Sequence, residues 1–236
     1  MRIGNATRAA GAVLAFSLGV SACGGGGEEE GPRFVVGAEK LCDGILSGDM
    51  ARAVEAMVGT KTLWRTGNDA LEDTASAIKD FYADSPDGRK YVGSKDFCRF
   101  AGYTRGAGQM DINFGIYRAD DALTTGHSAR EHPYRLGKRA LAGFDASRLY
   151  FECVSPQMDG SDEQPARINA SSRLSGPQGW RVEDTRATRE ANLTILHAAA
   201  LAVAKKLGCE NNAGLPEKVV LEPIADPVEP QSAPAT

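Results

Sequence analysis

The sequence predicts an α+β fold, with an antiparallel sheet covered by helices in a single disulfide-bonded domain. Three observations predict it. Apolar residues first recur at helical spacing, then alternate with polar residues over several stretches, and finally return to helical spacing. This order of helices, strands and a helix is typical of an antiparallel sheet with helices packed on it. An even number of cysteines follows residue 40, which favours disulfides in an exported chain.

The first elements are expected to be helical. Apolar residues recur across residues 41–58, but Gly44 and Gly48 weaken the middle of this stripe. It is therefore either one helix or two short ones, with Ser47 able to cap the second. A further apolar stripe at helical spacing covers residues 71–82 and predicts another helix.

Strands are expected in the middle of the chain. Residues 110–117 alternate between apolar and polar side chains, and residues 149–153 and 166–174 do so more weakly. Each stretch predicts a strand with one buried face. Pro177-Gln178-Gly179 is typical of a turn and leads into a short strand predicted at residues 180–183.

The last expected element is an alanine-rich helix over residues 193–207. Its apolar positions share one helical face, and they are Leu193, Leu196, Ala200, Val203 and Leu207. The stretch ends in Lys205-Lys206-Leu207-Gly208, where cations and a glycine suit a helix C-terminus.

Four cysteines lie within these elements, at Cys42, Cys98, Cys153 and Cys209. No C-x-x-C spacing typical of zinc or redox sites is present. The order of elements favours bridges Cys42–Cys98 and Cys153–Cys209, each attaching a helix to the sheet. The two other pairings that four cysteines allow remain open.

The N-terminus has the pattern of an export signal. Arg2 and Arg8 precede an uncharged apolar run over residues 9–20, too short to span a bilayer permanently, and residues 1–22 are therefore predicted to be a signal peptide. Val20-Ser21-Ala22-Cys23 resembles the lipobox of bacterial lipoproteins. That resemblance implies that Cys23 carries a diacylglyceryl group and palmitate and anchors the chain at the outer face of the cytoplasmic membrane. An ordinary cleavage site with an incidental cysteine is the alternative.

Composition sets the remaining boundaries. Residues 23–33 hold the lipidated cysteine and a flexible linker rich in glycine and glutamate. Residues 34–221 form the α+β domain, and the proline-rich residues 222–236 are expected to be a disordered tail.

The first half of the chain carries a wider resemblance. Four features carry this resemblance. They are the lipobox, the polar linker, a helix that opens at Leu41-Cys42-Asp43-Gly44-Ile45-Leu46 and ends at Val58-Gly59, and Phe97-Cys98 before a strand pattern. With these features, residues 19–118 resemble the uncharacterised secreted lipoproteins of actinobacteria, some of which belong to a lipobox-anchored family with a domain of unknown function. The resemblance implies an α/β sandwich and a lipid-anchored location, and it supplies no catalytic residues.

Charge excludes some partners and marks one segment. The net charge is −4, and removing residues 1–22 makes the balance more acidic, which argues against nucleic acid as a ligand and against electrostatic binding to anionic lipid as a general function. One basic segment stands out as a candidate contact loop for an envelope protein or an anionic wall polymer. Its residues are Arg130, Tyr134, Arg135, Lys138 and Arg139. An ordinary solvated connection is the alternative.

No catalytic, metal or cofactor site is assigned. Ser76 and Lys79 match S-x-x-K, but S-D-N and K-T-G are absent from the chain. His127, Glu131 and His132 fit no known spacing of metal ligands. The sequence therefore favours a non-enzymatic lipoprotein that binds a protein, polymer or small ligand in the cell envelope, held to the membrane by its lipid. An envelope hydrolase with an unrecognised active site is the alternative, and a purely structural component is a third.

Overall fold

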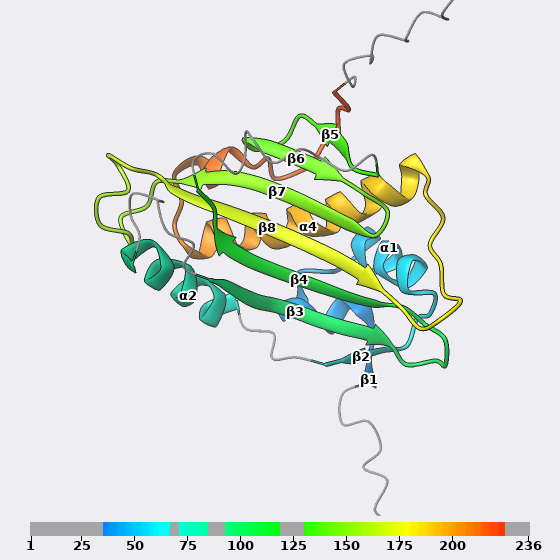
Figure 1. Cartoon of the computed structure of the whole chain (residues 1–236). Coiled ribbons are helices and arrows are strands. Elements are labelled where there is room, and N and C mark those ends of the chain that lie inside the picture. The colour runs from blue at the N-terminus through cyan, green and yellow to red at the C-terminus, as the bar shows by residue number, and fades with distance from the viewer. Residues whose placement is uncertain (1–34, 67–70, 85–92, 119–129, 225–236) are drawn as a thin grey trace, which may run out of the picture. The chain divides into compact units, whose positions relative to one another are not determined.

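The computed structural model describes residues 35–66, 71–84, 93–118 and 130–224 (Figure 1). Eight strands form one antiparallel sheet in the order β1-β2-β3-β4-β8-β7-β6-β5. The strands are β1 (Val35–Val36), β2 (Leu63–Arg65), β3 (Ser94–Gly102), β4 (Gln109–Ile116), β5 (His132–Tyr134), β6 (Arg139–Ala142), β7 (Ala146–Cys153) and β8 (Ala166–Ser175). The predicted antiparallel sheet is confirmed.

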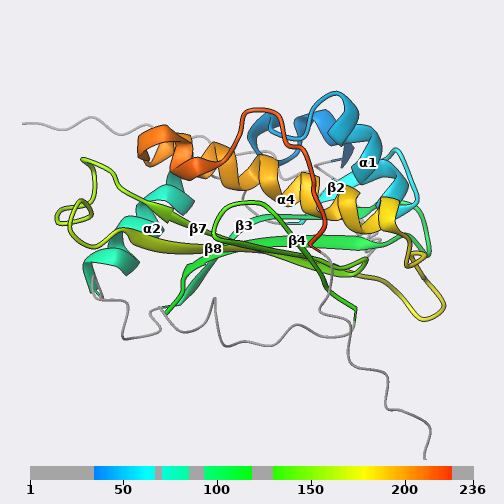
Figure 2. The ribbon, with the colours of Figure 1, turned by 90° about the horizontal axis from the view of Figure 1, so that it is seen from above.

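Within the described ranges, three α-helices accompany the sheet, and they are α1 (Asp49–Val58), α2 (Leu71–Asp84) and α4 (Arg186–Lys206). Short 3₁₀ turns cover Ala38–Lys40, Cys42–Gly44 and Glu210–Gly214. Figure 2 shows α4 and α1 on the same face of the sheet. The helix α2 contacts β3, β4 and α4. The α+β class with helices covering a sheet is therefore confirmed.

The core lies between the sheet and α4. In β4 the alternate residues Met110, Ile112 and Phe114 are buried, as the period-2 pattern predicted. The long helix α4 buries its apolar stripe against this face, including Leu193, Leu196, Ala200 and Val203. The predicted strands in β4, β7 and β8 and the predicted last helix are confirmed, and α4 begins earlier than expected, after Thr185 caps the amide of Thr188.

Both preferred disulfides are present. Cys42 is bonded to Cys98, which joins the second 3₁₀ turn to β3. Cys153 is bonded to Cys209, which joins the end of β7 to the residue that follows the last turn of α4. The first bridge thus attaches a short 3₁₀ turn to the sheet, where the sequence predicted either one helix over residues 41–58 or the first of two short helices.

Two local predictions were wrong. The α-helix within residues 41–58 begins only at Asp49, and its N-cap is Gly48 with φ of 62°, so Ser47 does not cap it. A positive φ suits glycine, which explains why the helical pattern breaks there. Residues 180–183 form no strand, because Trp180 packs beside Gly108 and Gly176, where added Cβ atoms would lie 2.3 Å and 2.4 Å from its ring.

The predicted tail also begins later than expected. Residues 222–224 lie beside β5, where Ile224 donates its N–H to the carbonyl of Pro133 and Arg135 donates to that of Glu222. The rest of the tail, the signal peptide, Cys23 and the linker to residue 33 lie outside the described residues. In the described part of the chain, no helix is both long enough and apolar enough to cross a membrane.

Candidate functional site

The chain after α4 separates two pockets. We call residues 215–224 the strap. It runs from the C-terminal end of α4 back to the edge strand β5 (Figure 1). Glu217 and Val219 line a pocket beside α4, while Pro216 and Val220 line a pocket beside the β5–β6 hairpin. Lys218 lines both. Neighbouring residues of the strap thus line different pockets, as expected when successive side chains of an extended chain point in opposite directions.

The pocket beside the hairpin is basic. It has a volume of about 580 Å³, and its cations are Arg135, Lys138, Arg139 and Lys218. The remaining lining residues are Tyr134, Leu136, Gly137, Gly214, Pro216, Val220 and Ile224. We call this the basic pocket. It combines the predicted basic segment with a lysine from the distant strap.

The cations of the basic pocket differ in whether they form ion pairs. Lys138 pairs with Glu152 at 2.6 Å. Arg135 and Lys218 are exposed and form no ion pair within the described residues. Val220 is 67% exposed and Ile224 is 41% exposed beside them. The pocket therefore offers positive charge together with apolar surface, which suits an anionic ligand with an apolar backbone.

The predicted contact loop is a β-hairpin in the structure. Tyr134 ends β5 and Arg139 begins β6, and Lys138 donates its N–H to the Tyr150 carbonyl at 2.8 Å. Gly137 has φ of 56°, and a Cβ there would lie 2.5 Å from the Tyr150 carbonyl oxygen. The turn therefore needs glycine at this position, and it holds the neighbouring cations on a fixed backbone.

Two members of the predicted segment differ from the other three, since Arg130 is exposed outside the basic pocket and Tyr134 is buried. The Arg130 guanidinium lies 4.0 Å from the Asp145 carboxylate and does not line the basic pocket. Tyr134 is buried and donates its hydroxyl to Glu190 at 3.2 Å. Burial and the negative charge of Glu190 raise the pKa of this phenol. Arg135, Lys138 and Arg139 are the three predicted cations that the structure brings together in the pocket.

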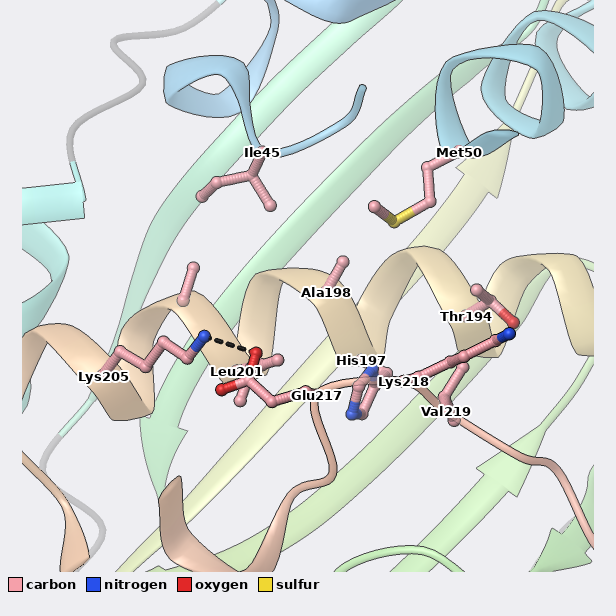
Figure 3. Close-up of a pocket in the computed structure, with 11 residues that line it drawn as sticks. Ile45, Met50, Thr194, His197, Ala198, Leu201, Lys205, Glu217, Lys218 and Val219 are labelled. Atoms are coloured by element: carbon pink, nitrogen blue, oxygen red, sulfur yellow. Dashed lines mark hydrogen bonds and ion pairs between the residues drawn. The ribbon is translucent and has the colours of Figure 1, made fainter. Parts of the chain in front are cut away.

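The second pocket is apolar and lies between α4 and the segment that leads into α1 (Figure 3). Its volume is about 460 Å³, within the range of small-molecule sites. Thr194, Ala198 and Ala202 recur every four residues along α4, and these small side chains leave the space open. Ile45 and Met50 lie opposite, and Lys205 pairs with Glu217 at 2.6 Å at one end.

His197 is the buried titratable group of this apolar pocket. It is 3% exposed, and its Nε2 has no hydrogen-bond partner among the described residues. Burial lowers the pKa of the imidazole, while a hydrogen bond with the backbone of Pro216 and the charge of Glu217 oppose that change. His197 is therefore neutral at pH 7 and connects α4 to the strap.

Acidification is expected to destabilise the fold through His197. The unfolded state binds a proton near pH 6.5, while the folded state resists it, so the free energy of unfolding falls as pH drops below about 6.5. Each unit by which the folded pKa is lowered contributes about 1.4 kcal/mol. Urea unfolding at pH 7.5 and pH 5 measures the loss, and H197Q should lose less than the wild type. An equal loss in both proteins would contradict this.

The described residues form no catalytic assembly in either pocket. Thr194 donates its hydroxyl to the Glu190 carbonyl at 2.7 Å and so does not serve His197. Ser76 and Lys79 lie on α2 and line neither pocket. Neither pocket therefore supplies catalytic residues that would support the hydrolase alternative.

Two of the possible metal ligands, Glu131 and His132, are described by the structure. Glu131 accepts two hydrogen bonds from Arg148, at 2.9 Å and 2.7 Å, and His132 begins β5. His127 lies outside the described residues. Within the described ranges, no group of three histidine, cysteine or carboxylate side chains is placed to hold a metal ion.

Sequence reasoning missed Lys218 and the pocket around His197. Lys218 stands beside the expected tail, eighty residues from the basic hairpin, and only the fold joins them. No periodic signal marked this segment, since Glu217 and Lys218 are followed by three consecutive apolar residues and do not alternate with them.

Comparisons of the chain with protein-family models, with curated proteins and with solved structures found no match. The resemblance to actinobacterial lipoproteins therefore stays a prediction.

Proposed function

We propose that this protein is a lipid-anchored lipoprotein of the cell envelope, and that its basic pocket binds an anionic wall polymer on the outer face of the cytoplasmic membrane. The signal pattern and the cysteine after Ala22 support the anchor. Two disulfides support an oxidising compartment outside the cytoplasm. The protein is then a binding module without an enzymatic role.

The order of the sheet supports a binding site directed away from the membrane. The chain enters the sheet at the edge strand β1, and the basic pocket lies at the opposite edge, beside β5. Seven strand spacings of about 4.8 Å separate these edges by about 34 Å. A protein tethered through its N-terminal side can therefore direct the pocket toward the wall.

The single observation that carries the ligand class is the pair Arg135 and Lys218. These cations come from separate parts of the chain, line one pocket, and have no ion-pair partner within the described residues. A repeating phosphate or carboxylate polymer would satisfy both, while Val220 and Ile224 would contact its carbon skeleton. An acidic envelope protein is the other partner that this charge would attract.

Removing these two charges is expected to abolish most of the binding. In R135Q/K218Q, affinity for an anionic wall polymer should fall about a hundredfold, since a hydrogen bond to a charged group contributes about 1.5 kcal/mol. Titration of purified polymer into the soluble C23A protein measures the change. Raising the salt concentration should weaken wild-type binding and hardly affect the variant.

A matched control separates this pocket from general charge. K40Q/K79Q removes two lysines from the first 3₁₀ turn and α2, neither of which lines the basic pocket. Its affinity should stay close to that of the wild type. If both variants bind equally well, the basic pocket is not the binding site, and if both lose affinity equally, net charge alone explains the binding.

The apolar pocket supports a second candidate, the binding of a small apolar ligand beside His197. The pocket volume of about 460 Å³ and the apolar lining favour it. Replacing Ala198 with phenylalanine would fill the pocket. Loss of binding of an apolar fluorescent probe in A198F, with unchanged far-ultraviolet circular dichroism, would support this site, and unchanged binding would exclude it.

A further inference from the structure

The exposed apolar side chains of the described residues fall into two groups. Val220 and Ile224 belong to the basic pocket. The other group consists of Val35, Trp64 and Tyr103, with exposed fractions of 37%, 46% and 47%. We call these three residues the aromatic patch. They lie at the β1 edge of the sheet, at the opposite end of the strand order from the basic pocket.

Strand register places the aromatic patch on one face. Val35 is the partner of Trp64, and Trp64 is the partner of Ala101, two residues before Tyr103. Opposed residues of antiparallel strands point to the same face, and alternate residues of one strand do so too. Leu63 and Phe100 occupy the other face, where both are fully buried in the core. The aromatic patch therefore lies on the face of the sheet opposite the core, and Figure 2 shows the described helices α1 and α4 on the core side.

Cations flank the aromatic patch. Tyr103 donates its N–H to the carbonyl of Thr62 at 2.8 Å, which brings the turn before β2 next to the turn after β3. Lys61 and Arg105 lie in these turns, are exposed, and form no ion pair within the described residues. Aromatic rings with a polar edge and flanking cations are the combination found at the water interface of lipid bilayers.

We propose that the aromatic patch contacts the membrane, with Trp64 and Tyr103 in the headgroup region and Lys61 and Arg105 at the lipid phosphates. This inference rests on the proposed lipid anchor at Cys23. Eleven residues lie between Cys23 and Val35, so twelve Cα–Cα steps give a reach of at most about 42 Å when extended. A glycine-rich random coil of that length would have an r.m.s. span of about 19 Å. The bilayer that holds the acyl chains is therefore within reach of the aromatic patch.

The contact would give the tether a preferred orientation. A single tether fixes the distance of the domain from the membrane but not which face it presents. Because the acyl chains already hold the domain close to the surface, even a weak contact by three side chains becomes intramolecular and is well populated. The basic pocket, at the opposite edge of the sheet, would then face away from the bilayer.

Tryptophan quenching tests this contact, because the chain has two tryptophans in different surroundings. Trp64 is 46% exposed, whereas Trp180 packs beside Gly108 and Gly176. The full-length acylated protein is reconstituted in phosphatidylcholine–phosphatidylglycerol vesicles with or without bromine on the acyl chains. Bromine is expected to reduce the emission of the wild type severalfold more than that of W64F, whose remaining tryptophan is Trp180.

The outcomes separate this inference from the anchor. If the acylated protein floats with the vesicles but the wild type and W64F are quenched equally, the aromatic patch stays in water and the inference is overturned while the anchor stands. If intact mass shows no acylation and the protein does not float, both proposals fail. K61Q/R105Q should reduce quenching of Trp64 without releasing the protein, and no reduction would remove these cations from the contact.

Discussion

Replacing Cys23 with alanine is expected to transfer the protein from the membrane fraction to the culture medium. The proposed acyl chains are attached through the sulfur of this residue, and alanine has none. Each buried methylene of an acyl chain contributes about 0.8 kcal/mol, so two chains hold a protein firmly while a few surface side chains do not. The described residues contain no helix able to span a membrane. Fractionation with immunodetection measures the distribution, and intact mass measures the modification.

The matched control is S21A, which keeps Cys23 and leaves a small residue within the predicted lipobox. This variant should stay with the membrane and keep its acyl mass. If the C23A protein also stays in the membrane fraction after a high-salt wash, the lipid anchor is wrong. The aromatic patch would then be too weak an explanation, since its three side chains are only partly apolar and net charge is −4.

Removing the Cys153–Cys209 disulfide is expected to lower the free energy of unfolding by about 4 kcal/mol. The bridge closes a loop of 56 residues, and the chain-entropy model gives that magnitude for the denatured state. For a domain of this size, the melting temperature should fall by about 8 to 16 °C. Urea unfolding and calorimetry of C153A/C209A in the C23A background measure both. A loss below about 1 kcal/mol would contradict the entropic account.

The second disulfide provides the internal control. Cys42 and Cys98 are also 56 residues apart, so the same model gives C42A/C98A the same loss. A difference between the two losses of unfolding free energy would therefore come from what each bridge does in the folded state. Cys153–Cys209 fixes the end of the long helix α4 to the sheet, and Cys42–Cys98 fixes only a 3₁₀ turn. Peptide mapping without reduction should recover Cys42 linked to Cys98, and a cross-pair with Cys153 would overturn the topology.

The elements that the sequence predicted correctly are those with an unbroken period. The strand β4 alternates without interruption, and α4 keeps one apolar face through its length. The strand β3 was not predicted because Phe97 and Cys98 are consecutive and both buried, owing to an irregularity in register between Asp96 and Cys98. Such a bulge places neighbouring residues on one face and removes the alternation.

Short or fully buried strands escaped prediction for another reason. In β6 the residues Ala140, Leu141 and Ala142 are all fully buried, so no polar residue marks an outer face. The strands β1 and β2 have two and three residues and are too short for any period. The strand β2 pairs with β3, and β1 pairs with β2, so both positions depend on tertiary interactions.

The candidate site was predictable only in part. A run of cations identified Arg135, Lys138 and Arg139, since charge density is visible in the sequence. The partners of these side chains in the fold are not visible in the sequence. The Arg130 guanidinium lies beside the Asp145 carboxylate, and the buried Tyr134 donates its hydroxyl to Glu190. The last three residues of the strap, 222–224, were assigned to a tail because of its prolines, although their backbone pairs with β5 and with Arg135. Composition describes the average behaviour of a segment and not its particular partners.

The two edges of the sheet have a consequence for molecules crowded on a surface. The strand β1 has only two residues. The outer edge of β5 is occupied by the strap; Pro133 lies in β5, and Pro223 of the strap is opposite Tyr134. Unpaired edges invite strands from other molecules, and short strands and prolines prevent this. Anchored proteins share a thin layer at high local concentration. Blocked edges would let many copies lie side by side there without polymerising through their sheets.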